Sequence, residues 1–204
     1  MFFWIADKPF SQVVAEIPLV ETLAGGIAYR EYSLSDGPWS IQVLQIPRKS
    51  REIMLEVSVG GSRILGLEPL DSIAARSSVR NGKAIAGVNG DFYILQQGPY
   101  QGDPIGLCVT RGELVSTPVR RSAAVILNNG EPVIDRFQFR SYLRRPDGQT
   151  VRIDGVNQQC PMNGIALLTP TFHDSTRTQD NAVALLAGPL EEPLAPKGKY
   201  TFTV

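Results

Sequence analysis

The chain has 204 residues, of which 43% are hydrophobic, so it can bury a sizeable core, and this composition excludes a disordered chain. Lysine plus arginine and aspartate plus glutamate both number 20. The resulting zero net charge argues against a nucleic-acid partner and against adsorption to an anionic membrane, since both need an excess of basic residues.

The first predicted elements are strands between residues 27 and 59. The run IAYREYSL alternates apolar and polar residues, WSIQVLQI follows a Gly-Pro turn, and REIMLEVSV follows basic residues. Residues 1–25 are interpreted as a lead-in. Their apolar start is short and lacks the features of a signal peptide, so the alternatives are a cytosolic chain, a signal already removed, or a sequence that lacks its true beginning. No apolar run is long enough to predict a membrane span.

One helix is predicted, over about residues 71–80. Asp71 can cap its first amides, and Asn81 and Gly82 supply its stop. The glycine-rich segment before it, VGGSRILGLEPL, lacks the dinucleotide-binding pattern and is expected to be a loop.

The stretch AIAGVNGDFY, residues 84–93, follows this helix. Its five small or apolar residues predict a buried strand, which would deliver Asn89 and Asp91 to the end of a sheet. Phe92 and Tyr93 are then expected to be buried and to anchor the exit of the chain. An Asn-Gly-Asp sequence is also a common turn, and this purely structural interpretation stays open.

Beyond this stretch the chain is expected to be antiparallel. Turn sequences at Gly112, Gly130 and Gly148 bracket the strand-like runs AAVILN and PVIDRFQF. The fold class predicted is α+β, with a mixed, largely antiparallel sheet and few helices. The strand-like run YTFTV ends the sequence without a closing turn, which indicates an incomplete domain.

A dense polar cluster marks the middle of the chain. Arginine binds phosphate or carboxylate with two parallel hydrogen bonds, and a carboxylate can act as base or nucleophile. Because Arg120 and Arg121 are expected to alternate along a strand, at most one should face a given side. Each member also has a structural interpretation as a turn residue or a surface pair, as does Asp154 in RIDGVN. The cluster contains Asn89, Asp91, Asp103, Arg111, Glu113, Arg120 and Arg121.

The sequence offers no recognisable metal motif. His173 is the one histidine, which excludes a multi-histidine site, and the two cysteines lack C-x-x-C spacing. We predict no metal site, and the sequence leaves the cofactor unknown. Cys108 lies in a strand-like run and Cys160 in a loop before Pro161, so we expect two free thiols.

Several blocks together resemble the phosphodiester glycosidase family. They are SIAARSSVRNGKAIAGVNGDFY, GDPIGLCVTRGELVS, RRSAAVILNNGEPVI, IDGVNQ and IALLTPTF, and their order and approximate spacing match the family from about Gly26 to Pro170. The resemblance implies hydrolysis of a sugar-1-phosphodiester at the anomeric carbon of a glycan or cell-envelope polysaccharide. It implies an extracytoplasmic or secreted setting, and it makes residues 26–204 the N-terminal part of such a domain.

The resemblance also assigns residues to the site. The family's Asn-Gly-(Gly/Asp)-Phe-(Phe/Tyr) block falls on Asn89 to Tyr93, its Gly-x-Pro-x-Gly block on Gly102 to Gly106, and its Arg-(Ser/Thr)-Ala block on Arg121 to Ala123. It implies a carboxylate role for Asp91 near the anomeric carbon and a phosphate-binding role for Arg121, with Asn89 beside them. Together with the polar cluster described above, this gives the predicted substrate-binding residues, which are Gly90, Asp103, Gly106, Arg120 and Asp154.

One feature of the family is missing from the sequence. The family carries a later Asp-Gly-Gly-Gly-Ser block, whereas this sequence contains no run of three glycines. Two further hypotheses therefore stay open: a non-catalytic carbohydrate or cell-wall binding module on the same scaffold, and a purely structural β-rich domain.

Overall fold

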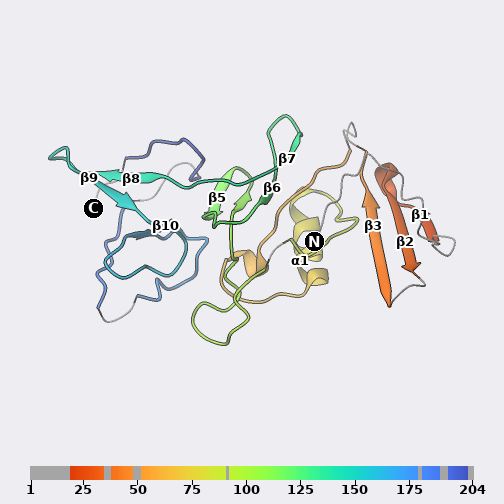
Figure 1. Cartoon of the computed structure of the whole chain (residues 1–204), viewed down its shortest axis with the longest axis horizontal. Coiled ribbons are helices and arrows are strands. Elements are labelled where there is room, and N and C mark those ends of the chain that lie inside the picture. Colours follow the sequence, from red (N-terminus) through yellow and green to blue (C-terminus); the bar gives the residue numbers. More distant parts are fainter. Residues whose placement is uncertain are drawn as a thin grey trace. The chain divides into compact units, whose positions relative to one another are not determined.

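The computed structural model describes residues 19–34, 38–47, 52–90, 92–178, 181–188 and 193–201 (Figure 1). The described elements are small, mostly antiparallel sheets and one short α-helix, so the protein is mainly β. The predicted antiparallel character is confirmed, but the strands form separate small sheets instead of one mixed sheet. The predictions for the apolar start and for residues 202–204 lie outside the described residues.

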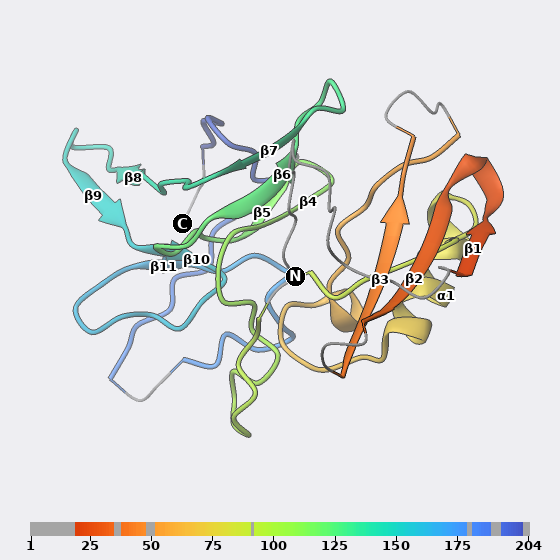
Figure 2. The same cartoon turned by 45° about the vertical axis from the view of Figure 1, so that its right-hand side comes forward.

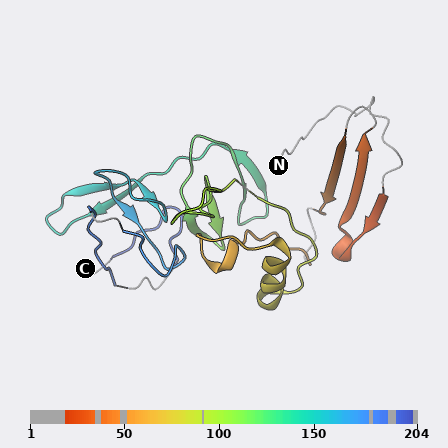
Figure 3. The ribbon, with the colours of Figure 1, turned by 90° about the horizontal axis from the view of Figure 1, so that it is seen from below.

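The chain divides into two compact units, Met1–Leu55 and Glu56–Val204. The first contains a three-stranded antiparallel sheet of β1 (Leu19–Thr22), β2 (Ala28–Leu34) and β3 (Trp39–Gln45), which lie side by side in Figure 3. The alternating runs at 27–34 and 39–46 thus predicted two of these strands correctly.

The third strand predicted from REIMLEVSV is wrong, because residues 52–59 form no strand. Two carbonyl groups of this segment accept hydrogen bonds from side chains instead. The Val57 carbonyl accepts one from Thr110 Oγ1 at 2.6 Å, and the Val59 carbonyl accepts one from the Arg76 guanidinium at 2.8 Å. Residues 57–59 are therefore held by side chains from elsewhere in the second unit.

The predicted helix is confirmed as α1 (Leu70–Asn81), which ends at Gly82 with a φ of 104°. The predicted cap is wrong, because the N-cap position is Pro69 and no side chain caps it. Asp71 lies inside the first turn, where its carboxylate accepts a hydrogen bond from the Ser72 amide at 2.7 Å. A carboxylate in the first turn also interacts favourably with the helix dipole.

The buried strand predicted at residues 84–88 is wrong. The segment has no strand partner, and residues 86–90 are exposed. Gly87 lies against the Leu70 side chain of α1, since a Cβ there would be 3.3 Å from Leu70 Cδ1. Phe92 and Tyr93 are 63% and 41% exposed, so they are not the buried anchors that their apolar character predicted. The small apolar run packs beside a helix and not within a sheet.

Three hairpins follow, each with a positive-φ glycine in its turn. Gly112, Gly130 and Gly148 have φ values of 80°, 80° and 85°, which only glycine adopts without strain, so the three predicted turns are confirmed. In the first hairpin Arg111 also has a positive φ of 51°, as in a two-residue type I′ turn. The hairpins, seen in Figure 2, are β4 (Cys108–Thr110) with β5 (Glu113–Ser116), β6 (Ala123–Ile126) with β7 (Pro132–Asp135), and β8 (Ser141–Arg144) with β9 (Thr150–Ile153).

The core of the second unit is small and is assembled from distant segments. Main-chain hydrogen bonds tie residues 64–65 to residues 171–172: the Ile64 amide donates to the Thr171 carbonyl at 2.8 Å. The buried apolar cluster consists of Ile64, Leu65, Cys108, Val115 and Phe172.

A buried asparagine joins this core to the C-terminal part of the unit. Asn157 follows β10 (Gly155–Val156), which pairs in parallel with β11 (Ala166–Leu167), and it is 0% exposed. Its Nδ2 donates to the Val115 carbonyl at 3.0 Å and to Thr169 Oγ1 at 2.9 Å, and its Oδ1 accepts from the Thr169 amide at 2.7 Å. One side chain therefore links β5 to the segment after β11.

We expect Asn157→Ala to lower the free energy of unfolding by about 2–4 kcal/mol, because it leaves the buried Val115 carbonyl and Thr169 amide without partners. Urea denaturation measures this. The control is Asn129→Ala at an exposed turn position, which should cost less than about 1 kcal/mol. Equal losses in the two variants would contradict the role of Asn157.

Both cysteines are free thiols, as predicted: Cys108 is buried in β4 and Cys160 is exposed. The Cys160 thiol donates a hydrogen bond to the Gly164 carbonyl at 3.3 Å. Cys108 is enclosed by the apolar cluster and packs there as a small hydrophobic residue.

We expect a maleimide reagent to label one thiol in the native protein and both in denaturant, because exposure controls the reagent's access. Intact-mass spectrometry counts the adducts, and Cys160→Ser should abolish native labelling. Rapid native labelling of Cys108 in that variant would show that the core opens readily.

Candidate functional site

A short two-stranded ribbon brings together two of the sequence blocks singled out above. The Ile105 amide donates to the Phe92 carbonyl at 2.8 Å, and the Ile94 amide donates to the Asp103 carbonyl at 2.9 Å. Tyr93 forms an isolated antiparallel bridge with Pro104 between them. The NGDFY and GDPIG blocks are therefore neighbours in space as well as in sequence.

Gly102 fixes this ribbon against the core segment. It has a φ of 91°, and a Cβ added there would overlap the carbonyl group of Gly66. The Gly66 amide donates to the Gln101 carbonyl at 2.9 Å beside this contact. Only glycine permits this approach of two backbones. Gly106 is buried and has a φ of 139°, so the second glycine of the block also has a backbone role.

Arg121 adds the third block to the same place. Its guanidinium carbon lies 4.7 Å from the centroid of the Phe92 ring, which is a cation–π geometry. Residues 120–121 form a bend and not the expected strand, with the Arg121 amide donating to the Val119 carbonyl at 2.7 Å. Among the described residues, no carboxylate forms an ion pair with Arg121.

Residues 89 and 90, shortly before Phe92, are open to solvent. Asn89 and Gly90 are both exposed, and apart from the chain neighbours of Gly90 no atom of the described residues lies within 4 Å of the position of a Cβ at Gly90. A ligand can thus approach this backbone closely. Asp91 lies outside the described residues, so the predicted grouping of Asn89, Asp91 and Arg121 stays a prediction.

Asp103 is the most perturbed carboxyl group of this region. It is 7% exposed, and its Oδ1 accepts no hydrogen bond within the described part of the chain. Burial raises the pKa of Asp103 to about 6, so this carboxyl keeps its proton to a higher pH than an ordinary aspartate does. Tyr100 lies close enough that its own pKa is raised, first by burial and then by the Asp103 charge.

Two of the predicted residues make their contacts elsewhere. The Asp154 carboxylate accepts a hydrogen bond from the Ile165 amide at 2.9 Å and lies 3.7 Å from Arg152 Nε. These contacts agree with the structural interpretation of Asp154 as a loop residue. Arg120 lines a separate hollow together with aromatic residues, whereas Arg121 lies over the Phe92 ring and is not among the residues that line this hollow.

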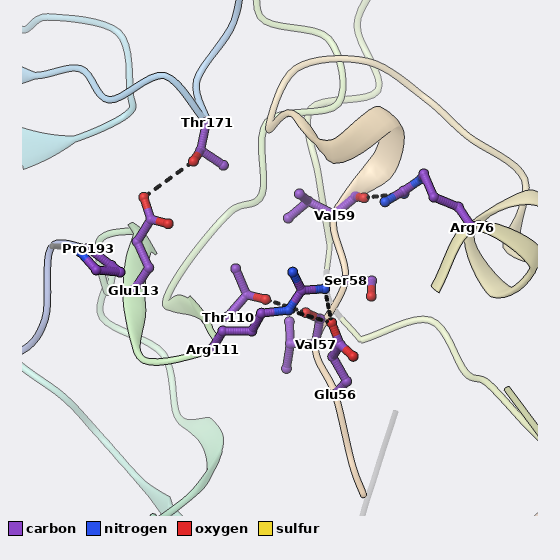
Figure 4. A pocket seen from close by; sticks show the side chains of 10 residues that line it. All are labelled: Glu56, Val57, Ser58, Val59, Arg76, Thr110, Arg111, Glu113, Thr171 and Pro193. Atoms are coloured by element: carbon purple, nitrogen blue, oxygen red, sulfur yellow. Dashed lines mark hydrogen bonds and ion pairs between the residues drawn. The ribbon is translucent and has the colours of Figure 1, made fainter. Parts of the chain in front are cut away.

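A second hollow, of about 300 Å³, lies in the same unit and is shown in Figure 4. Two of its carboxylates already have partners: Glu56 pairs with Arg111, and Glu113 accepts a hydrogen bond from Thr171 Oγ1 at 3.2 Å. Arg76 pairs with Glu68 at 2.6 Å. Because these partners come from the protein itself, the hollow offers less for a charged ligand than the exposed face around Arg121.

Sequence reasoning missed two residues that organise this region. Glu56 lies in the run wrongly predicted as a strand, and nothing local indicates that it pairs with Arg111 across 55 residues. Asn157 lies in the IDGVN block, but only Asp154 was singled out there. The usable signal in the sequence is the residue type, since asparagine is enriched at positive φ, and Asn157 has a φ of 52° in the structure.

Nothing in the described part of the chain indicates a metal site or a membrane span. No three His, Cys, Asp or Glu residues gather there in a group able to hold an ion. None of its helices combines the length and apolar character that crossing a bilayer requires.

Comparison with known proteins gives no relative. No family model matches the sequence, and neither a curated protein nor a solved structure matches it. The resemblance to phosphodiester glycosidases therefore stays a hypothesis that rests on the blocks quoted above.

We expect the stability of the protein to fall as pH rises from about 4 to about 6, through the contribution of Asp103. A carboxyl whose folded-state pKa is raised holds its proton more tightly when folded, so its contribution is lost as pH rises through that window. Asp103→Asn should remove this contribution, which lowers the free energy of unfolding by on the order of 1–2 kcal/mol across that pH range.

Urea denaturation at pH 4, 5, 6 and 7 measures the difference between the wild type and the variant. The difference isolates Asp103, because Glu68 has the opposite effect on the pH dependence of stability. Hydrogen bonds from Arg76 and Gly61 lower the pKa of Glu68. The exposed Asp135→Asn is the control. Parallel profiles for wild type and Asp103→Asn would contradict the buried, unpaired state of Asp103.

Proposed function

We propose that the protein is a hydrolase that cleaves a sugar-1-phosphodiester in a glycan or cell-envelope polysaccharide, as a relative of the phosphodiester glycosidases that acts outside the cytoplasm. One observation carries this proposal. Three separate blocks of the resemblance meet in space, because Phe92 pairs with Ile105 and the Arg121 guanidinium lies over the Phe92 ring. Such convergence is what a shared site requires.

The chemistry of the meeting point suits this reaction. The phosphate is already a good leaving group, so little acid assistance is needed. The reaction needs a carboxylate near the anomeric carbon and a cation on the phosphate. In the proposed site Asp91 is the base or nucleophile, Arg121 binds the phosphate, and Asn89 orients the sugar. The open space at Gly90 supports the approach of a substrate to the backbone.

The second candidate is a carbohydrate or cell-wall binding module without catalysis. It is favoured by the absence of an Asp-Gly-Gly-Gly-Ser run from the sequence. In this alternative Arg121 binds an anionic sugar by the same bidentate contact, and Asp91 has no chemical role. Turnover distinguishes the two candidates, whereas binding does not.

We expect the protein to convert a sugar-1-phosphodiester to free sugar and a phosphomonoester. Asp91→Asn should lower turnover by about 100-fold or more, because it removes the base or nucleophile and keeps the shape. Arg121→Lys keeps the charge but loses the planar fork, so it should raise KM by about 10-fold with a smaller change in kcat. Chromatographic detection of the free sugar measures both.

The matched controls are Asp135→Asn and Arg136→Lys, which change the same residue types at exposed positions of the second unit. Both should retain wild-type kinetics. Full activity of a folded Asp91→Asn variant would refute the role of Asp91. Saturable sugar binding without any turnover would favour the binding module.

A further inference from the structure

A hollow of about 460 Å³ lies beside the second and third hairpins of the larger unit. It is formed by the segment that leads into β6, by the connection from β7 to β8, and by one residue each of β8 and β9. Its lining residues are Pro118, Val119, Arg120, Phe137, Gln138, Phe139, Arg140, Tyr142 and Arg152. The proposed chemistry at Asp91 and Arg121 does not use this hollow, although Arg120 is among the predicted substrate-binding residues.

The hollow carries a local excess of positive charge. Three arginines line it and no carboxylate does, although the whole chain has no net charge. Among the described residues, the Arg140 side chain donates to the neutral Gln138 side chain at 3.2 Å, and Arg152 has a long contact of 3.7 Å to Asp154. Among the described residues, no ion pair involves Arg120. Such arginines can hold the carboxylates or phosphates of a ligand.

Aromatic side chains stand among these arginines. Phe137 and Phe139 are half-buried, and Tyr142 is 63% exposed. Tyr142 and Arg152 are directly opposed in the β8–β9 register, so both project from the same face of the hairpin. A flat ring next to a planar cation fits a ligand whose units each have an apolar face and a negative group.

We propose that this hollow binds an acidic oligosaccharide. The C–H faces of its sugar rings would pack on Tyr142 and the phenylalanines, and its carboxylates or phosphates would bind Arg120 and Arg152. A nucleic acid fits less well, because single-strand binding uses a basic groove that follows the backbone over several nucleotides, and this neutral protein offers three arginines here.

The inference goes beyond the proposed hydrolysis and does not depend on it. Arg120 directly precedes Arg121 in the chain, so the residue that would bind the acidic glycan is the sequence neighbour of the residue that would bind the phosphate. Binding and turnover are measured separately. The hollow can therefore bind its ligand in a protein that does not hydrolyse it, and hydrolysis can occur with the hollow empty.

Isothermal titration calorimetry with four probes tests the proposal: tetragalacturonate, a phosphorylated maltotetraose, unmodified maltotetraose and an eight-residue oligothymidylate. We expect binding of at least one acidic saccharide, at least 10-fold tighter than that of maltotetraose and weakened by salt. The stronger of the two acidic probes identifies the preferred anion. Arg120→Gln, Arg152→Gln and Tyr142→Ala should each weaken binding at least 5-fold.

The matched control is Arg136→Gln, which removes an exposed arginine outside the lining and should leave binding unchanged. Circular dichroism verifies the fold of each variant, and Arg152→Lys, which keeps the charge, should bind with intermediate affinity. Equal affinity for acidic and neutral probes, no binding of either acidic saccharide, or losses no larger than in Arg136→Gln would overturn the proposal. Tighter binding of oligothymidylate would overturn it in favour of a nucleic-acid site.

Discussion

The second unit depends on the hydrogen bonds of one buried side-chain amide, that of Asn157. The residue is 0% exposed, and its amide bonds to the Val115 carbonyl and to both the hydroxyl and the amide of Thr169. Its own backbone amide donates to the Leu167 carbonyl at 2.8 Å. In a region shielded from water each such bond is strong, and each lost partner is costly. The same side chain lies beside the small apolar cluster, because Val115 belongs to that cluster.

The close backbone contact between Gly66 and Gly102 attaches the ribbon that contains the candidate site to the core of the second unit. Residues 64 and 65 belong to the apolar cluster, Gly66 follows them directly, and Gly102 stacks on it. The ribbon of residues 92–94 and 103–105 lies next to this contact. The Arg121 guanidinium lies over the Phe92 ring, which belongs to the ribbon. The exposed Phe92 ring therefore makes its cation–π contact with Arg121 at the surface and not in the core.

Arg120 and Arg121 are adjacent in the chain, but their side chains make different contacts. Arg121 lies on the ring of Phe92, whereas Arg120 enters the aromatic hollow beside the later hairpins. A bend at these residues separates the two directions. In our proposals one surface binds the phosphate at the bond to be cut and the other binds the acidic units of the glycan. An anionic polymer could contact both because the two arginines are consecutive.

The sequence by itself determined the features that depend on neighbouring residues. The glycine turns at 112, 130 and 148, the helix stop at Gly82 and the alternating strands β2 and β3 all follow from local backbone preference and side-chain periodicity. Only the tertiary structure decided whether an apolar run finds a strand partner. Residues 52–59 and 84–88 have strand-like composition but are held by side chains or packed against α1. The burial of Asp103 and the link made by Asn157 likewise depend on segments far away in the chain, because burial and hydrogen-bond partners are properties of the assembled fold and not of local sequence.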